Sequence, residues 1–438
     1  MGTTRRGLAV GTDDPGIIAA LDDHTDRLAG IRPGAEAIVE VAAAHPDLAA
    51  LQLASAGLFL YGQTTEADAL AAAHLRAAHE LAPTMDEREQ ATLAALDRWQ
   101  AGAFLRAAEA YEAVVARWPT DLLAIKGLEF LYYVLGQQHL GPRFLAVMDL
   151  VGPANPDDAD VLAAHAFAAE LSGQTDRAAD LAEAALVVQP DTPWAHHALA
   201  HVFIVRGDPP AAIERLESFL PVWARSGRVI QAHNAWHLAV ALLDRLDLDR
   251  ADAVAREHLW GHLPDAPGEQ IDTISYLWRA EMAGATIAED RWRDVADHVA
   301  LRTHECVFPF LSAHHAYALA RAGADDALAQ LQATVARRTA ADDDEARRVW
   351  QPIGRAVVEA CAAHGRGDLA TAVATFAPVI EAMPAVGGGD AQDDLFRLAH
   401  LTALTGAGRT DDARAWWASM TAFKTPSPLD AALRDRIG

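Results

Sequence analysis

A spaced pattern of glycine, alanine and proline recurs along the chain and constrains its fold more than any other feature. Four glycines are each followed five residues later by an alanine, and the segments at Gly62 and Gly207 fit the same pattern. The four pairs are Gly102 with Ala107, Gly173 with Ala178, Gly367 with Ala372, and Gly408 with Ala413. In three segments a proline follows the glycine after seventeen residues, at Pro119, Pro190 and Pro384. Glycine ends one helix, the small residue allows the next helix to pack closely, and proline ends that second helix.

This order of residues is typical of the helix pairs of tetratricopeptide repeats. Apolar residues make up 51% of the chain, with alanine dominant and no sustained alternation of strand formers, which favours an all-α protein. We predict a tetratricopeptide-like solenoid of paired antiparallel helices, wound as a right-handed superhelix with a concave ligand pocket.

The expected domain organisation has three parts. We predict an N-terminal helical segment over 1–60 that packs on the solenoid, continuous degenerate repeats over 61–423, and a C-terminal tail over 424–438. The first helices of the pairs are expected at 161–172, 191–206, 228–245, 270–284, 304–322, 348–364 and 390–405. In a solenoid of this kind these first helices line the concave surface, where ligands bind.

Charge and cysteine usage limit the partners. The chain has 61 acidic and 36 basic residues, a net charge of −25, which repels phosphate backbones and argues against nucleic acid and anionic membranes as partners. Cys306 and Cys361 are the two cysteines; they form no disulfide framework and suit a reducing compartment. We therefore expect a cytoplasmic protein, whose oligomeric state the sequence leaves open.

Histidine pairs mark the candidate site. His197 and His201 are four residues apart, as are His233 and His237, and this spacing places each pair on one face of a helix. The loop sequences that follow the two segments imply a repeat offset of 39 residues, whereas the histidine pairs are offset by 36. The pairs are thus not equivalent repeat positions, which favours a converging site.

These histidines allow three interpretations. They can satisfy buried hydrogen bonds between alanine-rich helices, perform acid–base chemistry without a metal, or bind a divalent metal ion. We predict catalytic roles for His197, His201, His233, His237 and Asp272, and ligand binding by His165, Trp194, Trp236, Trp278, Arg279 and His314. Asp272 would orient an imidazole, and Arg279 would bind a carboxylate or phosphate of the ligand or pair with Asp272.

From about Asp86 to Phe396 the sequence resembles the tetratricopeptide repeat protein 38-like family. The segment His233-Asn234-Ala235-Trp236-His237 is the most specific match. Further matches are His165-Ala166-Phe167 with Glu170, Trp194-Ala195 with His197 and Ala200-His201-Val202, Asp272 with Leu277-Trp278-Arg279 and Glu281 with Gly284, Ala313-His314, and Ala391-Gln392 with Asp394-Leu395-Phe396. The resemblance implies the helical-repeat fold but no particular reaction.

The sequence departs from that family pattern at five positions. Ile204 and Ser312 stand where acidic residues are expected, Glu129 and Asp390 where histidines are expected, and Arg256 where aspartate is expected. These departures predict a ligand different from that of the relatives.

Two classes of function follow. In the first, a pocket rich in histidine and tryptophan binds a small polar or carboxylate-bearing molecule and transforms it by histidine acid–base chemistry, or by metal-dependent chemistry at the two HxxxH pairs. In the second, the protein is a non-enzymatic scaffold whose concave groove binds a peptide or protein. An enclosed pocket favours the first class and an open groove the second.

Overall fold

The computed structural model describes residues 2–422 and 426–438, and two compact units divide the chain. Unit 1 comprises residues 1–198 and unit 2 residues 199–438, so the boundary falls within helix α11, Pro193–Arg206. Apart from an isolated bridge between Thr3 and Ala9, the regular structure of the described ranges is helical. The predicted all-α class is confirmed.

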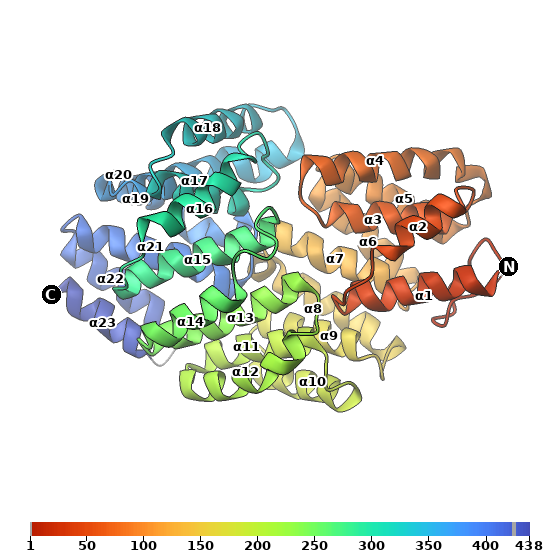
Figure 1. Cartoon of the computed structure of the whole chain (residues 1–438), viewed down its shortest axis with the longest axis horizontal. Coiled ribbons are helices and arrows are strands. Elements are labelled where there is room, and N and C mark those ends of the chain that lie inside the picture. The colour runs from red at the N-terminus through yellow and green to blue at the C-terminus, as the bar shows by residue number, and fades with distance from the viewer. Residues whose placement is uncertain (1, 423–425) are drawn as a thin grey trace. The chain divides into compact units, whose positions relative to one another are not determined.

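Unit 1 contains ten α-helices before α11 (Figure 1). They are α1 Pro15–Ala29, α2 Ala37–Ala44, α3 Ala49–Leu60, α4 Thr65–Glu80, α5 Glu87–Gln100, α6 Phe104–Arg117, α7 Leu122–Leu135, α8 Gln137–Val151, α9 Ala159–Leu171 and α10 Thr175–Val188. Short 3₁₀ helices η1, Ala82–Thr84, and η2, Gly152–Ala154, follow α4 and α8. The first three helices lie within the expected segment 1–60, and the breaks between them contain Pro33 and Pro46.

Unit 2 continues with the second half of α11 and the remaining helices. They are α12 Pro209–Trp223, α13 Arg228–Asp244, α14 Leu248–His258, α15 Pro267–Ala283, α16 Glu289–Ala300, α17 Pro309–Arg321, α18 Asp325–Thr339, η3 Ala346–Gly354, α19 Arg355–Gly365, α20 Leu369–Phe376, η4 Ile380–Val386, α21 Asp390–Gly406, α22 Thr410–Thr421 and α23 Pro428–Ile437. The expected tail 424–438 thus contains a helix, while its boundary at 423–424 lies outside the described residues.

The glycine and alanine positions act as the sequence predicts. Gly102, Gly173 and Gly367 each follow the first helix of a pair with φ between +72° and +75°, a left-handed conformation that glycine adopts without a steric penalty. The alanines five residues later, Ala107 and Ala178 among them, are fully buried. A larger side chain there would force the paired helices apart, so α5 with α6 and α9 with α10 pack side by side.

One expected α-helix has a different beginning. The helix expected at 348–364 starts as a π-helix, η3, before it becomes α19. Pro352 lies inside η3, and proline has no N–H to continue the α-helical hydrogen-bond ladder. The predicted start at 304 is also too early, because α17 begins at Pro309.

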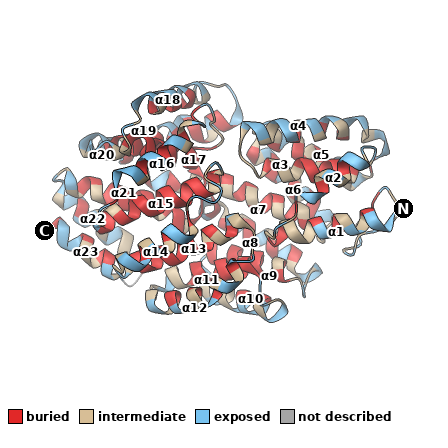
Figure 2. Ribbon diagram, in the orientation of Figure 1, coloured by how far each residue is buried: buried red, intermediate tan, exposed pale blue. Residues whose placement is uncertain are grey.

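Three helices of unit 2 are buried on nearly every face. In α15 fifteen side chains from Pro267 to Ala283 are buried, and α13 and α17 are buried in the same manner (Figure 2). Gly365 of α19 permits close packing on α17, since a Cβ there would lie 2.7 Å from the Tyr317 carbonyl oxygen. Polar residues on these helices must therefore find their hydrogen-bond partners inside the protein. The candidate site lies among these buried polar residues.

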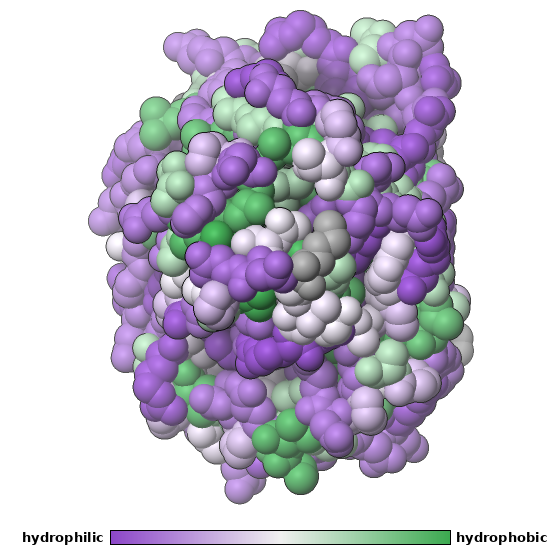
Figure 3. Space-filling view, turned by 90° about the vertical axis from the view of Figure 1, so that its right-hand side faces the viewer, coloured by the Kyte–Doolittle hydropathy of each residue, from purple (hydrophilic) through white to green (hydrophobic). Residues whose placement is uncertain are grey.

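The face seen in Figure 3 carries mostly hydrophilic residues, with apolar residues in separate patches. Within the described ranges no single helix is both long and apolar enough to span a membrane; α20 and η4 meet those criteria only as a pair bent by 77°.

Candidate functional site

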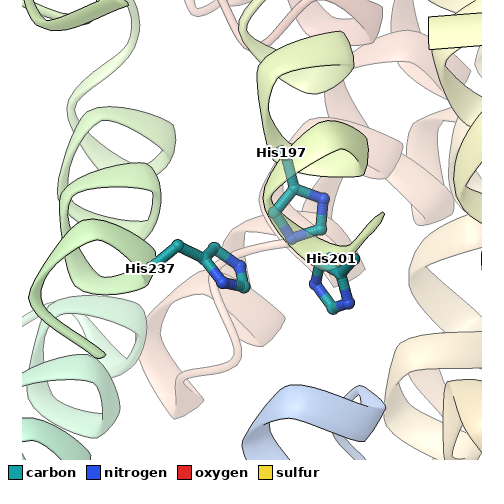
Figure 4. Close-up of side chains that lie close together, drawn as sticks. All are labelled: His197, His201 and His237. Atoms are coloured by element: carbon teal, nitrogen blue, oxygen red, sulfur yellow. The ribbon is translucent and has the colours of Figure 1, made fainter. Parts of the chain in front are cut away.

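A row of three imidazoles between two carboxylates lies inside unit 2. Asp390, at the start of α21, places Oδ1 2.8 Å from Nδ1 of His201 on α11. The His201 ring contacts His237 of α13 edge to face, with centroids 4.7 Å apart. Figure 4 shows these two rings, with His197 one turn before His201 on α11.

The row continues along α13 to a second carboxylate. His237 contacts His233 with centroids 4.9 Å apart and nearly perpendicular rings. Nδ1 of His233 lies 3.0 Å from Oδ1 and 3.1 Å from Oδ2 of Asp272 on α15. The order Asp390, His201, His237, His233, Asp272 defines what we call the histidine row.

Helix spacing accounts for part of this geometry. The i, i+4 spacing brings His233 and His237 onto one face of α13, and Trp236 stacks on His233 with an angle of 10° between the rings. Trp236 is fully buried, and its Nε1–H has no hydrogen-bond partner among the described residues. It forms a rigid apolar wall with one donor beside the row.

Burial controls the charge of the central imidazole. It lowers the pKa of His237 well below its usual value, and the neighbouring His201, His233 and Arg279 lower this pKa further. His237 is therefore neutral at pH 7, with one nitrogen that donates and one that accepts.

Arg279 is buried next to the row but is already engaged. Its Nη2 donates to the Ala391 carbonyl oxygen at 2.7 Å, and its Nη1 lies 3.5 Å from Asp394. Its guanidinium lies over the Trp236 ring at 5.7 Å. Burial lowers the pKa of Arg279, although a guanidinium keeps its proton in proteins. The structure thus places Arg279 as a link between α15 and the beginning of α21, the turn that carries Asp390.

Unit 1 holds a second group of predicted residues around the first half of α11. Trp194 stacks on His197 with ring centroids 4.2 Å apart, and Phe167 of α9 contacts both rings. Trp194 Nε1 donates to Glu129 Oε1 at 2.7 Å, and Lys126 lies over the indole ring at 4.2 Å. Glu129, at a position where histidine was expected, is therefore a direct neighbour of a predicted ligand-binding residue.

The other predicted site residues lie in separate surroundings. His165 Nε2 is 3.0 Å from Asp149 Oδ1 and 3.0 Å from Arg177 Nη2. His314 Nδ1 is 2.9 Å from the Phe310 carbonyl oxygen, and burial lowers its pKa to about 4.

Trp278 does not join the row either. It stacks on Tyr317 at 3.6 Å and also contacts His364 and Phe396. The histidine row therefore includes His201, His233, His237 and Asp272 of the predicted residues, with Trp236 and Arg279 next to it.

Sequence reasoning noted Asp390 only as a departure from the family pattern. The signal that could have identified it is its place directly after Gly387-Gly388-Gly389, where a helix begins. The amide groups of this turn form hydrogen bonds within the protein: Gly389 N donates to Gln392 Oε1 and Ala391 N to Asp390 Oδ1. A comparison with protein-family models finds no match to this chain.

Proposed function

We propose that the protein binds a small polar or carboxylate-bearing molecule at the histidine row and transforms it by acid–base chemistry. The observation that carries the proposal is the uninterrupted row of three imidazoles between two carboxylates. A structural histidine needs one hydrogen-bond partner, whereas this row links three titratable rings in direct contact.

The two carboxylates define what each outer imidazole does. An ionised carboxylate only accepts hydrogen bonds, so Asp390 and Asp272 select the tautomers of His201 and His233 that carry hydrogen on Nδ1. The Nε2 atom of each ring is then the basic nitrogen. This is the arrangement of an oriented general base, in which the carboxylate also stabilises the imidazolium that forms.

Access from solvent favours His233 and Asp390. The side chains of His233 and Asp390 are 17% and 18% exposed, whereas that of His201 is 3% exposed. A ligand would therefore exchange a proton with His233 or at the Asp390 end, with neutral His237 between the outer rings. The indole N–H of Trp236 would donate to a ligand oxygen.

We also propose a more specific description of the fold. Successive helix pairs with a left-handed glycine between them support a tetratricopeptide-like solenoid, with the first helices α11, α13, α15 and α21 supplying the row. The right-handed superhelix, the concave ligand pocket and the resemblance to the tetratricopeptide repeat protein 38-like family stay predictions, as does the cytoplasmic location.

A second candidate function is metal-dependent chemistry. Histidines that bind metals usually donate their other ring N–H to a carboxylate, as His201 and His233 are placed to do. Each HxxxH pair can also present two imidazoles from one helix face. The test is the metal content of untagged protein, compared with a His197→Ala/His233→Ala double variant. Near-stoichiometric metal that is lost in a still helical variant supports this candidate.

The acid–base proposal is tested with acetate, succinate and citrate as probes, followed by proton NMR. We expect saturable binding of at least one probe and, where it is a substrate, product signals that disappear in a His233→Gln/His237→Gln variant. His298→Gln is the matched control, since this histidine of α16 pairs with Asp265 and is not part of the row. Binding without conversion of any probe would favour a non-enzymatic binding protein. Absence of any effect of the double variant on binding and conversion would refute the proposal.

A further inference from the structure

A surface cleft of unit 2 lies apart from the histidine row. It has a volume of about 490 Å³, within the range of roughly 300–1,000 Å³ typical of small-molecule sites. Its lining residues come from α15, α17, α19, α20, α21 and α23 and from the turn between α19 and α20. The residues that decide its chemistry are Glu281, Arg321, His364, Arg366, Thr402 and Arg436.

The carboxylate of the cleft is already neutralised. Arg321 donates to Glu281 through Nε at 3.1 Å and through Nη2 at 2.9 Å. Glu281 also accepts from Trp292 Nε1 and from the Tyr317 hydroxyl. Arg321 in turn pairs with Glu289 at 3.0 Å, so this group of charges is satisfied within the protein.

Two further arginines lack such close carboxylate partners. Arg436 donates to the carbonyl oxygens of Met282 and Ala283, at 2.6 Å and 3.0 Å, and no ion pair joins it to a carboxylate of residues 2–422 or 426–438. Arg366 lies 3.8 Å from Asp325, with both side chains largely exposed. The cleft thus has an excess of positive charge, although the chain as a whole carries −25.

The rest of the cleft supplies surfaces for the uncharged part of a ligand. Tyr317 stacks on Trp278 and donates its hydroxyl to Glu281, and Leu369 adds an apolar lining residue. His364 Nε2 lies 3.1 Å from the Thr402 hydroxyl. Burial lowers the pKa of His364 to about 4, so this imidazole is a neutral hydrogen-bonding group at pH 7.

A structural role explains part of this arrangement. Arg436 covers the last carbonyl groups of α15, where a cation is favourable. That role uses two of the five guanidinium N–H groups and leaves the charge without a counterion. The backbone N–H of Arg366 donates to the Ala362 carbonyl oxygen at the end of α19, but its guanidinium donates to no carbonyl group in the described residues, so capping does not account for the charged side chain.

We propose that this cleft binds a small anionic molecule through a carboxylate or phosphate group held by Arg366 and Arg436. Both anions accept the forked, charge-assisted hydrogen bonds that arginine donates. The proposal does not depend on histidine chemistry, because none of the row residues lines the cleft.

The test is isothermal titration of the full chain with inorganic phosphate and with citrate, at constant ionic strength because exposed charges are screened by salt. We expect one saturable site for at least one probe, weakened about tenfold or more in Arg366→Gln and in Arg436→Gln. Binding of phosphate alone would assign a phosphate-bearing ligand, and binding of citrate alone a carboxylate-bearing one. Arg250→Gln is the matched control, since this exposed arginine on α14 pairs with Glu217 and Asp247 outside the cleft.

The outcomes separate this proposal from the previous one. No saturable binding of either probe, or binding unchanged in both cleft variants, would overturn it, and so would an equal loss in Arg250→Gln. His233→Gln should leave binding in the cleft intact, so a loss there would assign the anion to the histidine row instead. Because Arg436 contacts the end of α15, thermal unfolding followed by circular dichroism checks that Arg436→Gln is still folded. Arg366→Gln tests the proposal without disturbing that contact.

Discussion

Replacing His315 by leucine should make the protein less sensitive to acid. His315 lies on α17 and is 4% exposed, and its Nε2 is buried without a hydrogen-bond partner among the described residues. Burial lowers its pKa from 6.5 to about 3, with smaller contributions from the neighbouring His314 and Arg302. The folded protein therefore disfavours the imidazolium that the unfolded chain forms readily.

The sign and size of this pH effect on the free energy of unfolding follow from proton linkage. Because the folded-state pKa is lowered, the contribution of His315 to stability is fully present above pH 6.5 and is lost as the pH falls towards 3. Between pH 7 and pH 5, protonation of the unfolded state alone lowers the free energy of unfolding by about 2 kcal/mol, at roughly 1.4 kcal/mol per pH unit below 6.5.

Urea unfolding at pH 7 and pH 5, followed by circular dichroism, measures this effect. In His315→Leu the difference in the free energy of unfolding between the two pH values should be smaller than in the wild type by about 2 kcal/mol. Ser312→Ala is the control, since Ser312 is buried on the same helix but does not titrate in this range. An unchanged pH difference in His315→Leu would refute the reasoning.

Three further predictions concern other parts of unit 2. Gly388→Ala should lower the free energy of unfolding by about 1–3 kcal/mol in urea titrations, because φ at Gly388 is +93° and a Cβ would lie 2.8 Å from the Phe310 ring. A variant as stable as the wild type would show that alanine is not strained at this position. Glu281→Gln should cost about 1–3 kcal/mol in the same assay, because the paired Arg321 loses one of its two carboxylates; a double variant with Arg321→Gln should cost less than the sum of the single changes. Native protein at pH 8 should react slowly with a thiol reagent, because burial raises the pKa of Cys306 to about 12 and Cys361 is fully buried; two rapidly modified thiols before unfolding would rule this out.

The sequence by itself determined the class of fold and most helix positions. Glycine in a left-handed turn and a small alanine at the next helix contact are local requirements, so Gly173 and Ala178 could be placed without any knowledge of the tertiary structure. The π-helix at Pro352 was missed, because a missing backbone donor shows where a helix is perturbed but not which ladder replaces it.

For the candidate site, helix periodicity alone placed His233 and His237 on one face, since i, i+4 spacing is a property of the helix. Only the tertiary structure decided which carboxylates meet the imidazoles. His233 and Asp272 are 39 residues apart and His201 and Asp390 are 189 residues apart. Such pairings depend on how α15 and α21 pack against α13 and α11, and packing is decided by the shapes of whole helix faces, which no local pattern of residues records.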